Sequence, residues 1–231
     1  MFFGNYGLYI ILSLPALLLG LYAQAKVSGS FNKYSKVRTS NGMTGAEVAR
    51  HVLDASGLQN VEINQVRGNL SDHYDPRKKT LNLSQSVYST PSVAAAGVAA
   101  HEAGHAIQHA TNYGPLALRS LMVPSVQLGS WLGPVIFMAG LLLNFENLAL
   151  IGIILFAATA VFAIVTVPVE VDASKRAKAM LSSSGIIYSN EMVGVNAVLD
   201  AAALTYVAGA AQAVSTLLYY VLLFSGSRRR S

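Results

Sequence analysis

Residues 148–169 read LALIGIILFAATAVFAIVTVPV, a run of 22 residues without a charged side chain. A helix that spans the hydrocarbon core of a bilayer needs about 20 predominantly apolar residues. Three further uncharged stretches meet that length, at residues 6–25, 121–144 and 201–224. The sequence therefore predicts a mainly α-helical membrane protein with about four transmembrane helices.

The composition supports this class of protein. Hydrophobic residues make up 53% of the 231 residues and charged residues only 12%, whereas soluble domains carry about 25% charged residues. The net charge is +5, but no nucleic-acid recognition motif accompanies it, so nucleic-acid binding is not expected. The chain has no cysteine, which excludes disulfide scaffolds, cysteine-ligated zinc and thiol catalysis.

The basic residues predict how the chain is oriented in the membrane. They follow the first apolar stretch, precede the second and follow the third: Lys26, Lys33, Lys36, Arg38, Arg119, Lys175, Arg176 and Lys178. Because basic loops favour the cytoplasmic side, residues 26–119 and 170–200 are expected in the cytoplasm and Glu146 outside. Arg228, Arg229 and Arg230 disagree if the last stretch crosses completely, which leaves a re-entrant or surface-lying last helix open.

The sizeable polar segment lies between the first two apolar stretches. Thr44 and Glu47 have the spacing of a capping box, which predicts a helix that stops at Gly57. Short strands are expected at residues 61–66 and 80–84, because apolar and polar residues alternate there.

A second helix of this segment carries a reactive motif. Thr90 and Pro91 suit a helix start, and a stop signal follows at residues 112–115, which predicts a helix over residues 91–111. Within it, residues 101–105 read His-Glu-Ala-Gly-His. His101 and His105 project from one face, roughly 6 Å apart, and Glu102 lies close enough to act as general base on a metal-activated water. The motif predicts a hydrolase that holds one Zn²⁺ ion.

A third metal ligand must come from another part of the chain. Glu170 is the first candidate, because it follows the third apolar stretch and the intervening hairpin returns the chain to the membrane face of the His-bearing helix. Asp172 is the alternative, since its carboxylate suits zinc equally well. His109 lies about 12 Å along the helix axis from His101, so we expect it beside the site and not on the ion.

Substrate contacts are predicted from the same polar segment. Strand 80–84 is our candidate for an exposed edge that pairs with the substrate main chain, with an internal strand as the alternative. His73 is the candidate donor to the oxyanion of the tetrahedral intermediate, and Tyr74 and Tyr206 are alternatives. Because both ligand segments adjoin apolar stretches, we expect membrane proteins or membrane-delivered peptides as substrates, cut near the cytoplasmic membrane surface.

Several motifs together resemble the YugP-type neutral zinc metallopeptidases, which are small bacterial membrane proteins. They read DHYDP at 72–76, LNLS at 81–84, HEAGH at 101–105, EVDAS at 170–174 and LTYVA at 204–208. The resemblance covers nearly the whole chain and implies a multi-pass, gluzincin-type peptidase of the bacterial inner membrane, with Glu170 as third ligand. The chain is more distantly similar to the HtpX-type and CAAX-processing membrane peptidases. Ser174 stands where their Glu-x-x-Ala-Asp pattern has its Asp, so that carboxylate is either Asp172 or absent.

The expected organisation has five segments. They are an N-terminal transmembrane anchor (1–25), a metallopeptidase core (26–119) with the motif helix 91–111, a transmembrane hairpin (120–169), a third-ligand segment and helix (170–200), and a C-terminal transmembrane helix with a basic tail (201–231). The core is expected to be a small α+β, zincin-like cytoplasmic domain. The expected activity is zinc-dependent endopeptidase cleavage of membrane-associated or misfolded proteins. The alternative is a non-catalytic membrane adaptor or assembly factor with a vestigial metal site, which gives no reason for Glu102 to accompany the two histidines.

Overall fold

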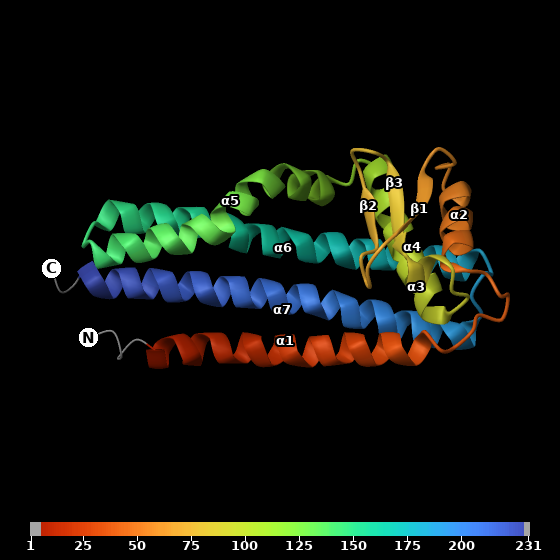
Figure 1. Ribbon diagram of the computed structural model, residues 1–231, viewed down its shortest axis with the longest axis horizontal. Coiled ribbons are helices and arrows are strands. Elements are labelled where there is room, and N and C mark those ends of the chain that lie inside the picture. Colours follow the sequence, from red (N-terminus) through yellow and green to blue (C-terminus); the bar gives the residue numbers. More distant parts are fainter. Residues whose placement is uncertain (1–5, 229–231) are drawn as a thin grey trace. The chain divides into compact units, whose positions relative to one another are not determined.

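The computed structural model describes residues 6–228, and most of that chain is helical (Figure 1). The helices are α1 (Tyr6–Tyr34), α2 (Gly45–Ala55), α3 (Gln85–Tyr88), α4 (Val93–Ala110), α5 (Gly114–Leu142), α6 (Glu146–Ser183) and α7 (Ser189–Arg228). The strands are β1 (Glu62–Val66), β2 (His73–Asp75) and β3 (Thr80–Ser84). They form one small three-stranded sheet.

Four helices of the described chain, α1, α5, α6 and α7, are long and apolar enough to cross a membrane. This is the number predicted from the four uncharged stretches of the sequence. The last stretch lies within a single uninterrupted helix, α7, which runs from Ser189 to Arg228. Arg229 and Arg230, which complicated the prediction of orientation, lie outside the described residues.

The chain divides into two compact units. The helical unit consists of Met1–Tyr22, Ala117–Pro168 and Thr205–Ser231, and the mixed unit consists of Ala23–Leu116 and Val169–Leu204. All three strands, α4 and the part of α6 from Val169 onward belong to the mixed unit. Every residue of the predicted metal site therefore lies in that unit.

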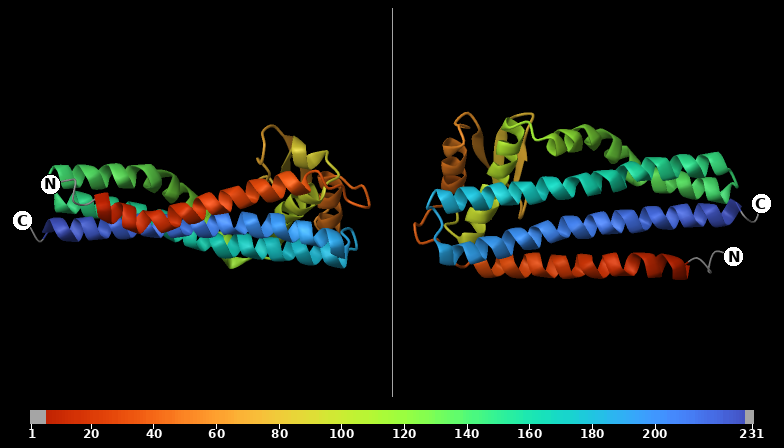
Figure 2. Two further views of the ribbon diagram at one scale, coloured as in Figure 1. Left: turned by 90° about the horizontal axis from the view of Figure 1, so that it is seen from below. Right: turned by 180° about the vertical axis from the view of Figure 1, so that it is seen from behind.

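In the helical unit, α5 and α6 form an antiparallel hairpin, which the views in Figures 1 and 2 agree on. Small residues allow membrane helices to approach closely. A Cβ atom on Gly133 of α5 would lie only 2.9 Å from the backbone nitrogen of Phe156 in α6. Pro124 and Pro134 lie inside α5, and proline bends a helix because it lacks a backbone N–H and clashes with the preceding turn. The bend of α5 is visible in Figure 1.

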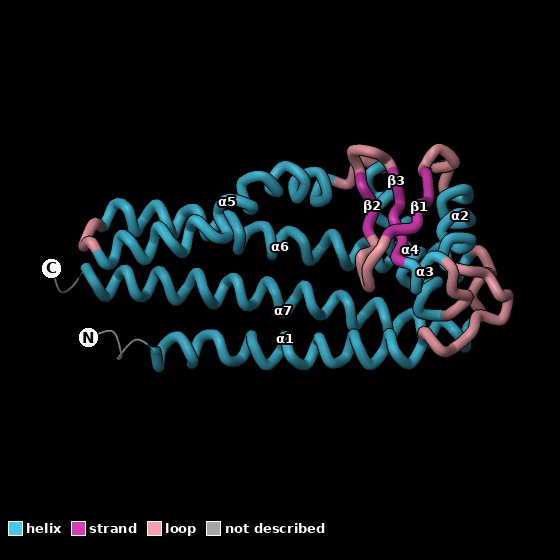
Figure 3. The backbone as a smooth tube through the Cα atoms, in the orientation of Figure 1, coloured by secondary structure: helices cyan, strands magenta, loops and turns pink. Residues whose placement is uncertain are grey.

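The sheet of the mixed unit has the order β1-β3-β2, and Figure 3 shows its three short strands together. β1 pairs with β3 in parallel, and β2 pairs with β3 antiparallel. The prediction that strand 80–84 is an exposed edge is therefore wrong: β3 is the central strand, and β1 and β2 are the edges. The cause is β2, a strand of three residues, which is too short to show an alternating pattern in the sequence.

The core of the mixed unit lies among α2, the sheet and α4. The capping box predicted for α2 is confirmed, because the Glu47 backbone N–H donates to Thr44 Oγ1 at 3.3 Å and the Thr44 N–H donates to the Glu47 carboxylate at 2.8 Å. This cap starts an amphipathic helix whose buried face packs mainly against α4. The fully buried residues of the core of the mixed unit include Val48, Val52, Leu53, Leu81, Leu83, Val87, Ala99 and Ala103.

The motif helix α4 begins two residues later than predicted. Ser92 is the N-cap, and its hydroxyl accepts a hydrogen bond from the Ala95 backbone N–H at 3.2 Å. α4 packs closely against α6 at Gly104, where an added Cβ would lie 2.6 Å from the backbone oxygen of Ala173. The glycine of the His-Glu-Ala-Gly-His motif thus allows the two backbones to approach.

We expect Gly104→Ala to lower the free energy of unfolding by about 1–3 kcal/mol, because the new methyl group overpacks a backbone contact. Gly97→Ala on the same helix is the matched control, since its Cβ would meet Val195 at an ordinary 3.6 Å. Thermal unfolding of both variants in detergent measures the difference. Equal melting temperatures for Gly104→Ala and the wild type would contradict this account of the packing.

Candidate metal centre

Three side chains of the mixed unit converge on one point. His101 and His105 come from α4 and Glu170 comes from α6, and one ligand atom from each lies within 4.8 Å of the others. The Oε2 atom of Glu170 is 3.1 Å from His101 Nε2 and 3.5 Å from His105 Nε2. Among the described residues, one group of histidine and acidic side chains is close enough to share an ion, and it consists of these three.

The cluster fits a tetrahedral divalent cation. Two ligand atoms that each lie 2.0–2.1 Å from zinc are about 3.3 Å apart at the tetrahedral angle. The observed separations of 3.1 and 3.5 Å bracket that value. Glu170 is only 2% exposed, and a carboxylate that is so buried needs compensating charge. A divalent cation supplies that charge, so these three residues are suited to hold Zn²⁺.

Glu170, and not Asp172, is the acidic residue that the structure places beside the two imidazoles. The Asp172 carboxylate instead accepts hydrogen bonds from Arg176 Nε at 2.6 Å and from Gln108 Nε2 at 2.8 Å. Both partners hold it outside the His101, His105 and Glu170 cluster.

The second ring nitrogens of both histidines have protein partners. His101 Nδ1 lies 3.1 Å from the hydroxyl of Ser174, and His105 Nδ1 lies 2.9 Å from Oε1 of Gln108. Partners of this kind orient metal ligands and tune their basicity. Gln108 is not among the residues predicted from the sequence, although its position three residues after His105 puts the two side chains on one helix face.

Glu102 lies at the edge of the cluster and is only 9% exposed. Its carboxylate accepts a hydrogen bond from the backbone N–H of Tyr74 in β2, at 3.1 Å. Its charge also acts on His105. Burial by itself lowers the pKa of His105, but the hydrogen bond to Glu170 and the charges of Glu102 and Glu170 outweigh it and raise the pKa above its usual value.

His73 has partners away from the cluster. Its ring nitrogens lie 2.9 Å from the Ser71 carbonyl oxygen and 3.2 Å from Asn82 Nδ2. The next residue, Tyr74, reaches α4, where its hydroxyl lies 2.9 Å from Nδ1 of His109. Because successive strand residues point to opposite faces, His73 faces away from α4. The structure therefore does not bring His73 to the three candidate ligands, and His109 has a partner of its own in Tyr74.

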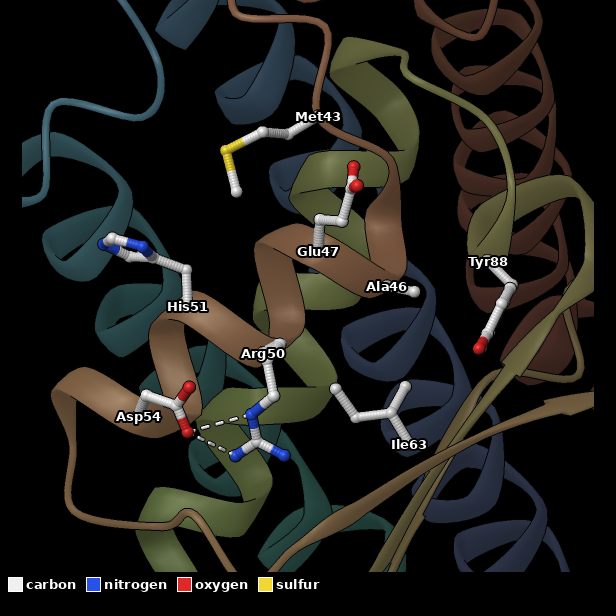
Figure 4. Close-up of a pocket in the computed structure, with 8 residues that line it drawn as sticks. All are labelled: Met43, Ala46, Glu47, Arg50, His51, Asp54, Ile63 and Tyr88. Atoms are coloured by element: carbon white, nitrogen blue, oxygen red, sulfur yellow. Dashed lines mark hydrogen bonds and ion pairs between the residues drawn. The ribbon is translucent and has the colours of Figure 1, made fainter.

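Two hollows of the mixed unit lie near α2 and α4. The first, of about 290 Å³, is lined by Leu58, Asn60, Val61, Tyr74, Lys79, Ala106, His109, Ala110 and Asn112. The second, of about 530 Å³, is shown in Figure 4 and includes His51 and Arg50 of α2. Arg50 is bound to Asp54, with Nε and Oδ1 2.9 Å apart. The three metal-ligand candidates line neither hollow.

Comparison with known proteins identifies the family. The family described as "Putative neutral zinc metallopeptidase" matches residues 9–225. The chain is similar to the "Putative membrane protease YugP" of Bacillus subtilis (strain 168), with 49% identity over 221 residues that cover 96% of this chain and 98% of the relative. No solved structure matches significantly. The resemblance seen in the sequence motifs is thereby confirmed, and the chain belongs to this family of neutral zinc metallopeptidases.

Proposed function

We propose that the protein is a membrane-bound, zinc-dependent endopeptidase in which His101, His105 and Glu170 hold one Zn²⁺ ion. The observation that carries the proposal is the convergence of two imidazoles and a buried carboxylate next to Glu102. The family supports the same chemistry, and the printed name of the Bacillus relative, a membrane protease, agrees with it.

Glu102 has the central role in the proposed reaction. Zinc, when bound, acidifies a water molecule and polarises the carbonyl group of the peptide bond. The Glu102 carboxylate accepts a proton from the attacking water and returns it to the nitrogen of the leaving amine. The Tyr74 N–H, 3.1 Å from Glu102 Oε2, keeps the carboxylate in place. A base held by one hydrogen bond retains free lone pairs for the water.

The free edge of β2 is the proposed docking strand for substrate. β3 is paired on both sides, so the predicted role of strand 80–84 passes to its edge neighbour. The Tyr74 N–H donates to Glu102, so the unpaired side of β2 faces the carboxylate that we propose as the base. A substrate strand that pairs there has its peptide bonds next to Glu102, and main-chain pairing gives affinity without strict sequence preference.

We propose a multi-pass location in the inner membrane of a bacterium, with the active site on the cytoplasmic side. The basic residues that flank the apolar stretches support this orientation. α6 has 38 residues, about 57 Å at 1.5 Å per residue, and a hydrocarbon core is about 30 Å thick. Part of α6 must therefore project beyond it. Since Glu170 directly follows the uncharged run 148–169, the proposed substrates are membrane-associated or misfolded polypeptides cut near the surface.

Glu102→Gln tests whether the protein is an enzyme. We expect the variant to keep its zinc and to lose peptide hydrolysis by about 10²–10⁴-fold, because the general base is gone while the ligands remain. Hydrolysis of a quenched fluorescent peptide and elemental analysis of purified protein give the two readouts. Glu62→Gln, an exposed glutamate of β1, is the control. A zinc-bound wild type whose cellular function survives Glu102→Gln would favour a non-catalytic adaptor.

Glu170→Ala and Asp172→Asn distinguish the two acidic candidates for third ligand. We expect Glu170→Ala to lose its zinc on dialysis, because two imidazoles alone hold the ion weakly. Asp172→Asn should keep one zinc per chain, since its side chain still offers an acceptor to Gln108 and Arg176. Elemental analysis after identical dialysis measures both. Zinc lost only from the Asp172 variant would reverse the assignment.

A membrane-tethered substrate should be cut faster than the same peptide free in solution. The reason is that tethering concentrates the peptide at the surface where we place the active site. The protein is reconstituted into liposomes and offered one fluorescent peptide with and without a lipid anchor. Equal rates for the two forms would refute the proposed substrate class but leave the peptidase activity intact.

A further inference from the structure

Gln108 is a completely buried polar side chain, with 0% exposure, on the last turns of α4. We propose that Gln108 sets the tautomer of His105, so that Nδ1 carries the proton and the lone pair of Nε2 faces Glu170 before any metal arrives. Gln108 is then a positioning residue for metal capture. This inference rests on the metal site proposed above, but the tautomer can be measured without zinc.

The first step is that the orientation of the Gln108 amide is fixed. Its Nε2 atom lies 2.8 Å from the backbone oxygen of Val169 and 2.8 Å from Oδ2 of Asp172. A carbonyl oxygen and a carboxylate oxygen both accept hydrogen bonds, so the group between them must be the NH₂. The reversed amide would place its oxygen against two acceptors. Arg176 also pairs with Oδ2 of Asp172, at 2.6 Å, which holds that carboxylate as a charged acceptor.

The fixed orientation of the Gln108 amide determines which nitrogen of His105 carries the proton. With the NH₂ group directed at α6, the Oε1 atom of Gln108 faces His105 Nδ1 at 2.9 Å. An amide oxygen accepts and never donates, so Nδ1 must carry the hydrogen. A neutral imidazole has one N–H only, which leaves Nε2 of His105 with its lone pair. Nε2 is the atom that lies 3.5 Å from the Glu170 carboxylate.

The His105 Nε2 lone pair and the Glu170 carboxylate are two acceptors that face each other. In the neutral ring, the Nε2 lone pair faces a carboxylate oxygen in a buried site, which is unfavourable unless a cation, either a proton or a metal ion, lies between them. A divalent ion at that point is bound by both atoms at once. Gln108 thus prepares the cluster for metal by excluding the neutral tautomer in which Nε2–H of His105 would satisfy Glu170 directly.

The other histidine provides an internal contrast. His101 Nδ1 lies 3.1 Å from the hydroxyl of Ser174, and a hydroxyl can either donate or accept. Ser174 therefore does not select a tautomer of His101. Gln108 and Ser174 each contact the Nδ1 atom of one histidine. The amide of Gln108, whose orientation is fixed, should matter more for zinc affinity than the hydroxyl of Ser174.

Zinc affinity of three variants tests the proposal. We expect Gln108→Met to bind zinc about 10–100-fold more weakly, as is usual when a partner of a metal ligand is lost. Ser174→Ala should lose less. Gln108→Glu, made in the Asp172→Asn background to avoid facing carboxylates, keeps an acceptor for His105 although its second oxygen meets the Val169 carbonyl, and it should bind zinc more tightly than Gln108→Met. Competition with a chromophoric chelator measures the affinities.

A role in packing alone predicts the opposite order. Methionine is apolar and close in size to glutamine, so it suits a buried site, whereas a buried glutamate does not. Zinc affinity that is higher in Gln108→Met than in the Gln108→Glu, Asp172→Asn protein would therefore overturn the proposal. Circular dichroism spectra of the variants show whether each one is folded.

The tautomer itself is read by nitrogen NMR of the metal-free protein labelled with ¹⁵N-histidine, which gives few signals because the chain has five histidines. At a pH where the imidazole is neutral, we expect His105 to carry its proton on Nδ1 in the wild type and to be mixed in Gln108→Met. A proton on Nε2 in the wild type would overturn the inference and leave the peptidase proposal standing. A wild-type protein that binds no zinc would contradict the peptidase proposal, whichever tautomer His105 adopts.

Discussion

The close approach of α4 and α6 is the constraint on which the rest of the site depends. A carboxylate as buried as that of Glu170 is unfavourable by itself, and the imidazoles of His101 and His105 lie near enough to compensate it. They reach it because Gly104 has no side chain where the helices meet, beside the backbone oxygen of Ala173. The glycine of the motif is thus as much part of the candidate site as its histidines, because a larger residue at position 104 would move His101 and His105 away from Glu170.

Residues with local consequences could be predicted from the sequence. The spacing of His101 and His105 fixes their common face through helix geometry alone. The capping box likewise joins two residues, Thr44 and Glu47, that are three positions apart in the chain. The uncharged stretches likewise indicate helices that are long and apolar enough to cross a membrane. In each case the energy that determines the structure comes from neighbours in sequence, so the sequence contains the whole signal.

Features that depend on distant parts of the chain could not be predicted in the same way. The central place of β3 follows from its pairing with β2, whose three residues show no periodicity of their own. His73 looked suited to an oxyanion role by residue type, but strand alternation turns it away once Tyr74 contacts α4. The spacing of Gln108 from His105 is visible in the sequence, but the orientation of its amide is not, because two of its three hydrogen bonds end on α6.

Helix periodicity determines which of the two acidic residues, Glu170 or Asp172, faces the histidines. Residue type alone does not distinguish them. Residues four apart share a face of α6, and residues two apart do not. Glu170 and Ser174 therefore both point at the imidazole rings, on Nε2 and Nδ1 of His101 respectively. Asp172 and Arg176 form the second pair on a different face, and there they meet Gln108. Two acidic residues that are equal as zinc ligands by chemistry thus have different surroundings: Glu170 faces the proposed ion position, and Asp172 fixes the amide that we propose orients His105.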